Sequence, residues 1–342
     1  MNGLDLPLIW AGVIAGAVLL YVLLDGFDLG VGVLFPFAGS PAARDVMMDS
    51  IAPVWDGNET WLVLGGAGLM AAFPGAYAVV MPALYVPVLT MLMGLILRGV
   101  AFEFRLHGRR RSKALWTAAF AGGSLIATLA QGCVLGGFIQ GIKVKDGAFA
   151  GGPFDWLTPY ALTVAAGLVA GYALLGAAWI IWRAEDDLHR RARRWAWIAA
   201  IAAALLLAVV SVATLHVDPR AAARWGLAAG RIDVAALAPR LAIPGLGAAG
   251  FAVVAAGLAR RAHAAPFAGA ALVFLSGYLG LAASFFPYVV PYSLTFRQAA
   301  SAENALALML AVAGVLLPLI LGYTVWVYWL FRGKVGADAG YH

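Results

Sequence analysis

Two aspartates, Asp25 and Asp28, interrupt the apolar stretch LDGFDLGVG near the start of the chain. Residues three apart share one face of a helix, so the two carboxyls are expected side by side, about 4.5 Å apart along its axis. A carboxylate in hydrocarbon costs about 2.5 to 3.5 kcal/mol, and the surrounding segment contains no Lys or Arg to offset this cost. Such a pair predicts a site that holds or carries a proton.

A second acidic pair lies in SIAPVWDGNETWLV, where Asp56 and Glu59 are again three residues apart. If a helix begins near residue 50, this pair lies about 9 to 13 Å along it, while Asp25 lies about 26 Å along the first helix. Because the two helices cross the membrane in opposite directions, all four carboxyls are expected to converge in its inner half. Asp56, flanked by tryptophans, is the best single candidate for a proton carrier.

The stretch LRGVAFEFR adds the cation Arg98 and the acid Glu103 at the same expected level. One interpretation is a structural ion-pair network, in which Arg98 neutralises a carboxylate and Asn58 supports the pairing. The alternative is a proton-conducting entrance from the cytoplasm, because acids on neighbouring membrane helices usually mark proton or ion pathways. The residue pattern favours the second interpretation without excluding the first.

The positions of histidine and cysteine predict that this chain binds neither haem nor metal. Each of the five histidines falls in an expected loop, helix end or tail, so none lies in mid-membrane to ligate a haem. They are His107, His189, His216, His263 and His342. Cys133 is the only cysteine, so neither an intrachain disulfide nor a thiolate metal cluster can form.

Composition assigns these residues to a membrane protein. The chain is 63% hydrophobic and 12% charged, whereas soluble domains carry about 25% charged residues. We therefore expect an all-α, polytopic transmembrane bundle of about nine helices in a single membrane domain, 1–342. The expected helices are 8–35, 50–73, 77–103, 114–140, 157–183, 194–216, 241–259, 265–287 and 302–331.

The distribution of positive charge predicts the orientation. With the N-terminus outside, sixteen of the 23 Lys and Arg residues fall in cytoplasmic segments. The C-terminus is then cytoplasmic, provided that the break at Phe73-Pro74-Gly75 is a true reversal and not a kink. The net charge of +6 is spread over short loops, so it gives no basic face large enough for nucleic acid.

The three motifs DGFDLGVG, SIAPVWDGNETWLV and RGVAFEFR together resemble subunit II of cytochrome bd-type quinol oxidases, including the cyanide-insensitive ones. FPYVVPYS near residue 286 and the ending LPLILGYTVWVYWLFRGKV extend the resemblance over nearly the whole chain. Family members often carry Gln or another residue where this chain has Glu59. This extra carboxyl leaves the detail of proton entry open.

The resemblance implies that the chain is a haem-free subunit of a quinol:oxygen oxidoreductase in the bacterial inner (cytoplasmic) membrane. Such an enzyme generates a proton-motive force, and this subunit would not be active alone. Its partner would be subunit I, which carries two haems b and haem d and uses quinol and oxygen. A small single-helix accessory subunit, membrane lipids and a structural quinone are further possible partners. The resemblance also implies that Asp25, Asp28 and Asp56 line a proton route, and that oxygen reaches the haems near Trp61.

Two rival functions remain at this point. A proton-coupled secondary transporter would also place acids in the membrane, but the sequence lacks the inverted repeats typical of such carriers. A purely structural scaffold subunit would stabilise its partner without moving protons. Quinone type and cyanide sensitivity are not encoded in any motif we recognise.

Overall fold

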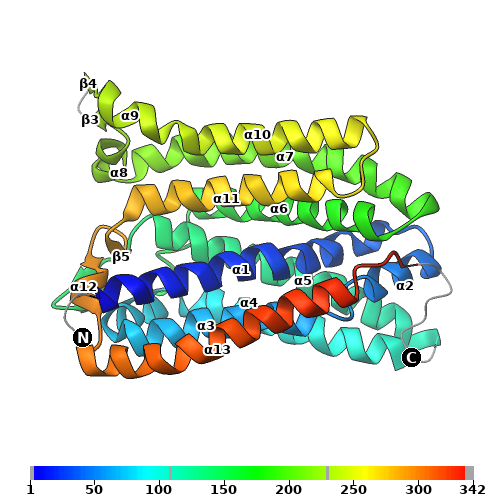
Figure 1. The fold of residues 1–342 in the computed structure, drawn as a ribbon, viewed down its shortest axis with the longest axis horizontal. Helices are drawn as coiled ribbons and strands as arrows, with labels where there is room; N and C mark the ends of the chain where they lie inside the picture. Colours follow the sequence, from blue (N-terminus) through cyan, green and yellow to red (C-terminus); the bar gives the residue numbers. More distant parts are fainter. Residues whose placement is uncertain (1–3, 108–109, 229–230, 336–342) are drawn as a thin grey trace.

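Long helices running along a common axis make up nearly the whole molecule (Figure 1). The computed structural model describes residues 4–107, 110–228 and 231–335. Within these residues, eight helical segments are long and apolar enough to cross a membrane. They are Leu6–Phe37, Pro74–Arg105, Ser112–Ile139, Pro159–Arg183, Asp186–Val217, Val234–Ala259, Ala265–Phe285 and Glu303–Leu330. The expected helical membrane bundle is confirmed at this level.

Each predicted range overlaps one long helix, with ends within five residues of the prediction except that α7 begins at Asp186, eight residues before 194. The helices are α1 Leu6–Leu34, α2 Pro41–Asp49, α3 Trp55–Ala72, α4 Pro74–His107, α5 Arg110–Ile139, α6 Pro159–Arg183, α7 Asp186–Val217, α8 Pro219–Arg224, α9 Val234–Arg240, α10 Ala242–Ala259, α11 Ala265–Phe285, α12 Phe296–Ala299 and α13 Glu303–Leu330. A 3-10 turn, Phe35–Phe37, extends α1. Three two-stranded hairpins lie in loops: Val144–Lys145 with Ala148–Phe149, Leu227–Ala228 with Arg231–Ile232, and Tyr288–Val290 with Leu294–Thr295.

The second expected crossing, 50–73, corresponds to α3, which is not among the eight segments above. It begins at Trp55 instead of residue 50, and its polar first two turns make it less apolar than the eight segments above. The Trp55 ring lies 5.2 Å from that of Phe102 near the end of α4, while at the other end of α3 a single residue, Phe73, separates Ala72 from α4. The chain therefore reverses direction at Pro74. The count of nine crossings stays a prediction.

Helix α2 was not predicted, although the sequence contains its start signal. The Ser40 hydroxyl accepts a hydrogen bond from the Ala43 amide at 3.1 Å, and Pro41 occupies the first helical position. The helix ends at Asp49, and Pro53 then prevents a continuous helix into α3. Residues 50–54 form the turn between them.

Helix α1 is the centre of the fold. All residues from Asp25 to Gly32 are buried, so this half of the helix is covered on every side. Glycine permits the closest contact: a Cβ on Gly30 would lie 2.9 Å from the backbone nitrogen of Gly176 in α6. The backbones of α1 and α6 therefore touch, as the abundance of glycine in a membrane bundle leads one to expect.

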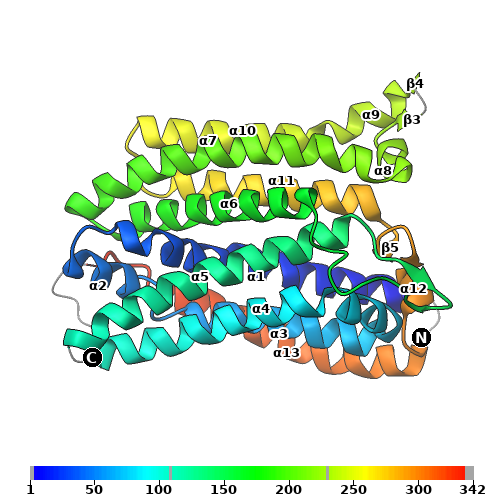
Figure 2. The same cartoon turned by 180° about the vertical axis from the view of Figure 1, so that it is seen from behind.

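The other helices surround this pair. Helices α6, α7, α10 and α11 form one side of the bundle, whereas α3, α4 and α13 lie on the other side of α1 (Figures 1 and 2). In α13 only Leu306 and Val327 are buried, so this helix rests on the surface of the chain. Helix α1 begins and α13 ends at opposite ends of the bundle (Figure 1).

Candidate functional site

The two aspartates of α1 are both buried, with exposed fractions of 0% for Asp25 and 1% for Asp28. Asp25 forms an ion pair with Arg98 of α4, through its Oδ1 and the Arg98 Nη2. Asp28 has no Lys or Arg partner among the ion pairs of the described residues; its Oδ2 accepts a hydrogen bond from the Asn58 amide at 2.7 Å. Of the predicted pair, Asp25 therefore has a charged partner and Asp28 an uncharged one.

Arg98 connects α4 to both neighbouring helices. It is fully buried, and its Nη2 also lies 3.6 Å from a Glu59 carboxylate oxygen of α3. Its guanidinium group lies 5.5 Å from the centre of the Trp55 ring, within the range of a cation–π contact. The cluster therefore contains one buried cation and three carboxyls, those of Asp25, Asp28 and Glu59, so it carries excess negative charge unless it binds protons.

Asn58 links the cluster to the last helix. Its side-chain NH2 group donates to Asp28 and, at 3.3 Å, to the backbone carbonyl of Leu24. Its carbonyl oxygen accepts a hydrogen bond from the hydroxyl of Tyr328 in α13 at 2.8 Å. Every hydrogen-bonding group of this buried amide is used, so its orientation is fixed by partners on both sides.

Asp56 does not join the cluster, which corrects the expected convergence of four carboxyls. Its side chain is exposed, whereas Asn58 is buried and Glu59 keeps 29% of its side chain exposed. Successive helical residues are about 100° apart, so Asn58 points about 200° away from Asp56. When Asn58 faces the interior, Asp56 must face outward and Glu59 lies at the boundary.

Glu103 also lies outside the cluster. It is exposed near the end of α4, between the buried Phe102 and Arg105. It lies five residues beyond Arg98, about 7.5 Å further along the helix axis. The sequence placed Glu103 at this end of the bundle but did not show that its side chain faces outward.

Trp61 lies on the inward face of α3, one turn beyond Asn58. Only 3% of it is exposed, and it packs with Ala17 and Tyr21 of α1. Its indole Nε1 has no hydrogen-bond partner within the described residues. The contacts around Trp61 that we find are therefore largely apolar.

A second buried cation, Arg105, sits at the end of α4 and was not singled out from the sequence. Its Nη1 forms an ion pair with Asp45 of α2 at 2.7 Å, and its Nε donates to the Thr117 hydroxyl at 3.1 Å. Partial burial raises the pKa of the neighbouring Asp49, the charge of Asp45 raises it further, and Arg105 opposes both. Arg105 thus fastens α2 over this end of the bundle.

Tyr328 is the site residue that sequence reasoning missed. It lies in an aromatic and apolar ending that reads as a membrane-interface belt. Its proximity to Asn58, 270 positions earlier, arises only from the packing of α13 against α1 and α3. Its hydroxyl was the only available signal, and Tyr323 and Thr324 in the same ending carry hydroxyl groups as well.

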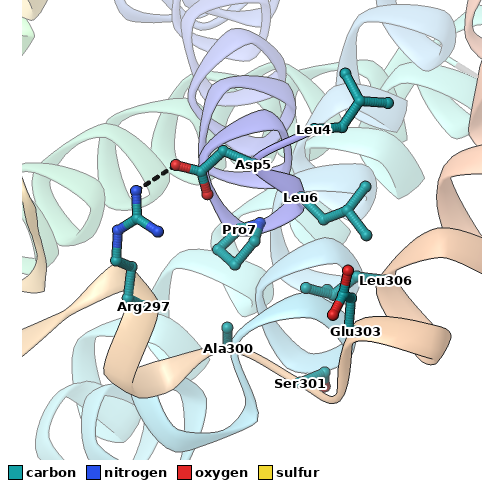
Figure 3. Close-up of a pocket in the computed structure, with 9 residues that line it drawn as sticks. All are labelled: Leu4, Asp5, Leu6, Pro7, Arg297, Ala300, Ser301, Glu303 and Leu306. Atoms are coloured by element: carbon teal, nitrogen blue, oxygen red, sulfur yellow. Dashed lines mark hydrogen bonds and ion pairs between the residues drawn. The ribbon is translucent and has the colours of Figure 1, made fainter. Parts of the chain in front are cut away.

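A separate cavity of about 450 Å³ opens at the other end of the bundle, where α1 and α13 begin (Figure 3). Arg297 and Asp5 form an ion pair on one side of it, and Glu303 lies on the other. Leu4, Leu6, Pro7, Ala300, Ser301 and Leu306 complete its lining. Because Asp25 lies about 28 Å along α1 from Leu6, this cavity is remote from the acidic cluster.

The described histidines lie at helix ends and in loops. His189 Nδ1 faces the Ile181 carbonyl oxygen at 3.1 Å, and His216 Nδ1 faces the Val212 carbonyl oxygen at 2.9 Å. Groups of three or more potential metal ligands are not found in the described residues. His342 and the side chain of His107 lie outside the described part of the chain.

Comparisons with known proteins agree along almost the whole chain. Residues 6–331 match the family model described as cytochrome bd terminal oxidase subunit II. The chain is 30% identical to cytochrome bd-I ubiquinol oxidase subunit 2 of Escherichia coli (strain K12), covering 96% of this chain and 95% of the relative. It is 29% identical to cytochrome bd ubiquinol oxidase subunit 2 of Bacillus subtilis (strain 168), covering 96% of each.

The fold also has a counterpart among solved structures. A chain of the bd oxidase from Geobacillus thermodenitrificans superposes with a TM-score of 0.78 at 18% identity. The match covers 97% of this chain and 100% of the other. At this identity the likeness concerns the fold.

Proposed function

This chain belongs to the cytochrome bd terminal oxidase subunit II family, and we propose that it delivers protons from the cytoplasm to the oxygen-reducing centre of such an oxidase. Reduction of one oxygen molecule to two waters consumes four electrons and four protons. Two quinols supply the electrons and release their own protons. If the consumed protons come from the cytoplasm and the released ones leave outside, each turnover separates charge.

The observation that carries the proposal is Asp28, a buried carboxyl whose only side-chain hydrogen-bond partner among the described residues is the Asn58 amide. An ionised carboxylate without a cation is costly in hydrocarbon, and a protonated one is not. Its Oδ1 and the Asp25 Oδ2 have no hydrogen-bond partner among the described residues, so each oxygen can accept a proton. Two such oxygens one helical turn apart form the core of the proposed route.

Glu59 is the proposed entrance to this core. Among the ion pairs that the described residues form with Arg98, it is the carboxyl that keeps part of its side chain exposed. Asp56, exposed in the first turn of α3, and Glu103, exposed near the end of α4, would collect protons before this point. Arg98 holds Asp25 and Glu59 in place, and Asn58 holds Asp28.

The remaining parts of the proposal concern the setting. We place the N-terminus outside and the C-terminus in the cytoplasm of a bacterial inner membrane, with 1–342 as one membrane domain of nine crossings. Two haems b and haem d, carried by the partner subunit I, would supply the electron-transfer and oxygen chemistry. The helix-end positions of the described histidines support a haem-free role for this chain. The largely apolar surroundings of Trp61 support oxygen access there; lipids, a structural quinone or a single-helix accessory subunit could bind elsewhere.

The test is Asp28→Asn in the purified two-subunit oxidase. We expect quinol oxidase turnover to fall at least tenfold while the haem spectrum stays that of the wild type. Asp187→Asn, which alters an exposed aspartate near the same end, is the matched control and should retain turnover. Wild-type turnover of Asp28→Asn with full haem content would favour the scaffold role instead. A colourless preparation that transports a solute would favour the transporter.

A further inference from the structure

The Tyr328 hydroxyl connects helix α13 to the acidic cluster. The Tyr328 hydroxyl donates to the Asn58 carbonyl oxygen at 2.8 Å, and the Asn58 NH2 group donates to Asp28 at 2.7 Å. The Tyr328 ring is held separately, with its centroid 6.5 Å from Phe27 and 6.3 Å from Trp179, both in edge-to-face geometry. The ring contacts place the hydroxyl, and the hydroxyl acts on the amide.

The orientation of the Asn58 amide decides what Asp28 meets. In the observed orientation, the NH2 group faces two acceptors, Asp28 and the Leu24 carbonyl. After a 180° rotation, the amide oxygen would face both acceptors, and an ionised Asp28 would lose its donor. The same rotation would turn the NH2 group toward Tyr328, whose hydroxyl would then accept from it and lose the Asn58 oxygen as the acceptor for its own hydrogen, so the hydroxyl favours the observed orientation. A neutral hydrogen bond of this kind contributes about 1 kcal/mol, which is about a fivefold bias in favour of one orientation.

We propose that Tyr328 is a positioning residue for proton transfer at Asp28, acting through the Asn58 amide. This inference rests on the proposed function of Asp28 and deepens it. The hydrogen bonds from Tyr328 through Asn58 keep an N–H donor on Oδ2 of Asp28. They leave the other carboxylate oxygen, Oδ1, as the place where the proton arrives. The last helix therefore takes part in the proton route although it contributes no acid to it.

The experiment uses Tyr328→Phe in the purified complex, because this variant keeps the ring and removes only the hydroxyl. We expect turnover to fall about twofold to tenfold, and the carboxyl C=O stretch assigned to Asp28 by isotope labelling to shift or broaden in the infrared difference spectrum. Tyr323→Phe removes a hydroxyl from an exposed tyrosine on the same helix and should leave both readouts unchanged. An effect on turnover with an unaltered Asp28 band would mean a merely structural role and would overturn the inference.

A double variant separates the inference from the function on which it rests. In an Asp28→Asn background, Tyr328→Phe should cause no further loss, since residues that act through one group are not additive. Additive losses would overturn the positioning role. If Asp28→Asn impairs turnover and Tyr328→Phe does not, only the inference fails. If Asp28→Asn has no effect, the proposed function itself fails.

Discussion

Replacing Arg98 by glutamine tests the charge balance of the whole cluster. Among the described residues, Arg98 is the only Lys or Arg found in ion pairs with the acids of the cluster, which are Asp25, Asp28 and Glu59. Both Arg98 and Asp25 are fully buried. Without Arg98, the Asp25 carboxylate loses its cation, and Glu59 loses a charge 3.6 Å away. Glu59 is partly exposed and can rely on water, so the main penalty falls on Asp25.

The size of the penalty follows from two competing outcomes. Removing one partner of a buried ion pair costs about 3 to 5 kcal/mol if the other stays charged. Alternatively, Asp25 takes up a proton, which from an ordinary pKa near 3.9 costs about 4 kcal/mol at pH 7 and about 1.5 kcal/mol at pH 5. The folded variant then binds one proton more than the unfolded chain, so its stability falls by about 1.4 kcal/mol per pH unit as pH rises.

The assay is the free energy of unfolding of the oxidase in bilayers or bicelles, measured at pH 5 and pH 7 against the wild type. We expect a loss of about 3 to 4 kcal/mol at pH 7 that shrinks by about 1.5 to 2.5 kcal/mol at pH 5. The double variant Arg98→Gln/Asp25→Asn should be more stable than the single variant at pH 7 and show no such pH dependence. A pH-independent loss, or a double variant as unstable as the single one, would refute the reasoning.

Two further changes test the parts of the molecule around the site. Burial and the charge of Asp45 raise the pKa of Asp49, so the folded protein disfavours the charged form of this carboxyl. The resulting loss of stability grows as the pH rises through the folded-state pKa. Asp49→Asn should therefore raise the thermal midpoint at pH 8 but not at pH 4. Gly30→Ala should lower the midpoint by an amount corresponding to about 1 to 3 kcal/mol or more, since its Cβ would strike the α6 backbone, whereas Gly12→Ala in the same helix meets nothing within 4 Å and should not.

The long helices were predictable because membrane hydrocarbon imposes a length and an apolar composition that are visible in one sequence. The break at Pro74 was also correctly favoured as a reversal, since α3 and α4 together would be too long as one helix. Helix α2 escaped because its nine residues carry no membrane signal. Its capping serine and following proline were visible but are common in loops as well.

The site was predictable in its members more than in its geometry. Acids, Arg98 and Asn58 stand out against an apolar background, so their types alone identified them. The facing of each side chain depends on how α3 rotates about its own axis, and that angle follows from packing around Trp61 and Asn58. A spacing of three residues places Asp56 and Glu59 on neighbouring parts of a helix, yet only the packing decides which of them lies at the boundary.

Gly26 and Gly30 of DGFDLGVG bring α6 onto one face of α1 and leave the opposite face, which carries Asp28, to the Asn58 amide of α3. A Cβ on Gly26 would lie 2.6 Å from the Tyr172 ring, and one on Gly30 would lie 2.9 Å from the Gly176 nitrogen. Helix α6 therefore packs directly on this face of α1, about 200° around the helix from Asp28. The compact Asn58 approaches from α3 instead, and an uncharged partner lets Asp28 change its protonation state without breaking an ion pair. Close packing and proton chemistry thus depend on the same motif.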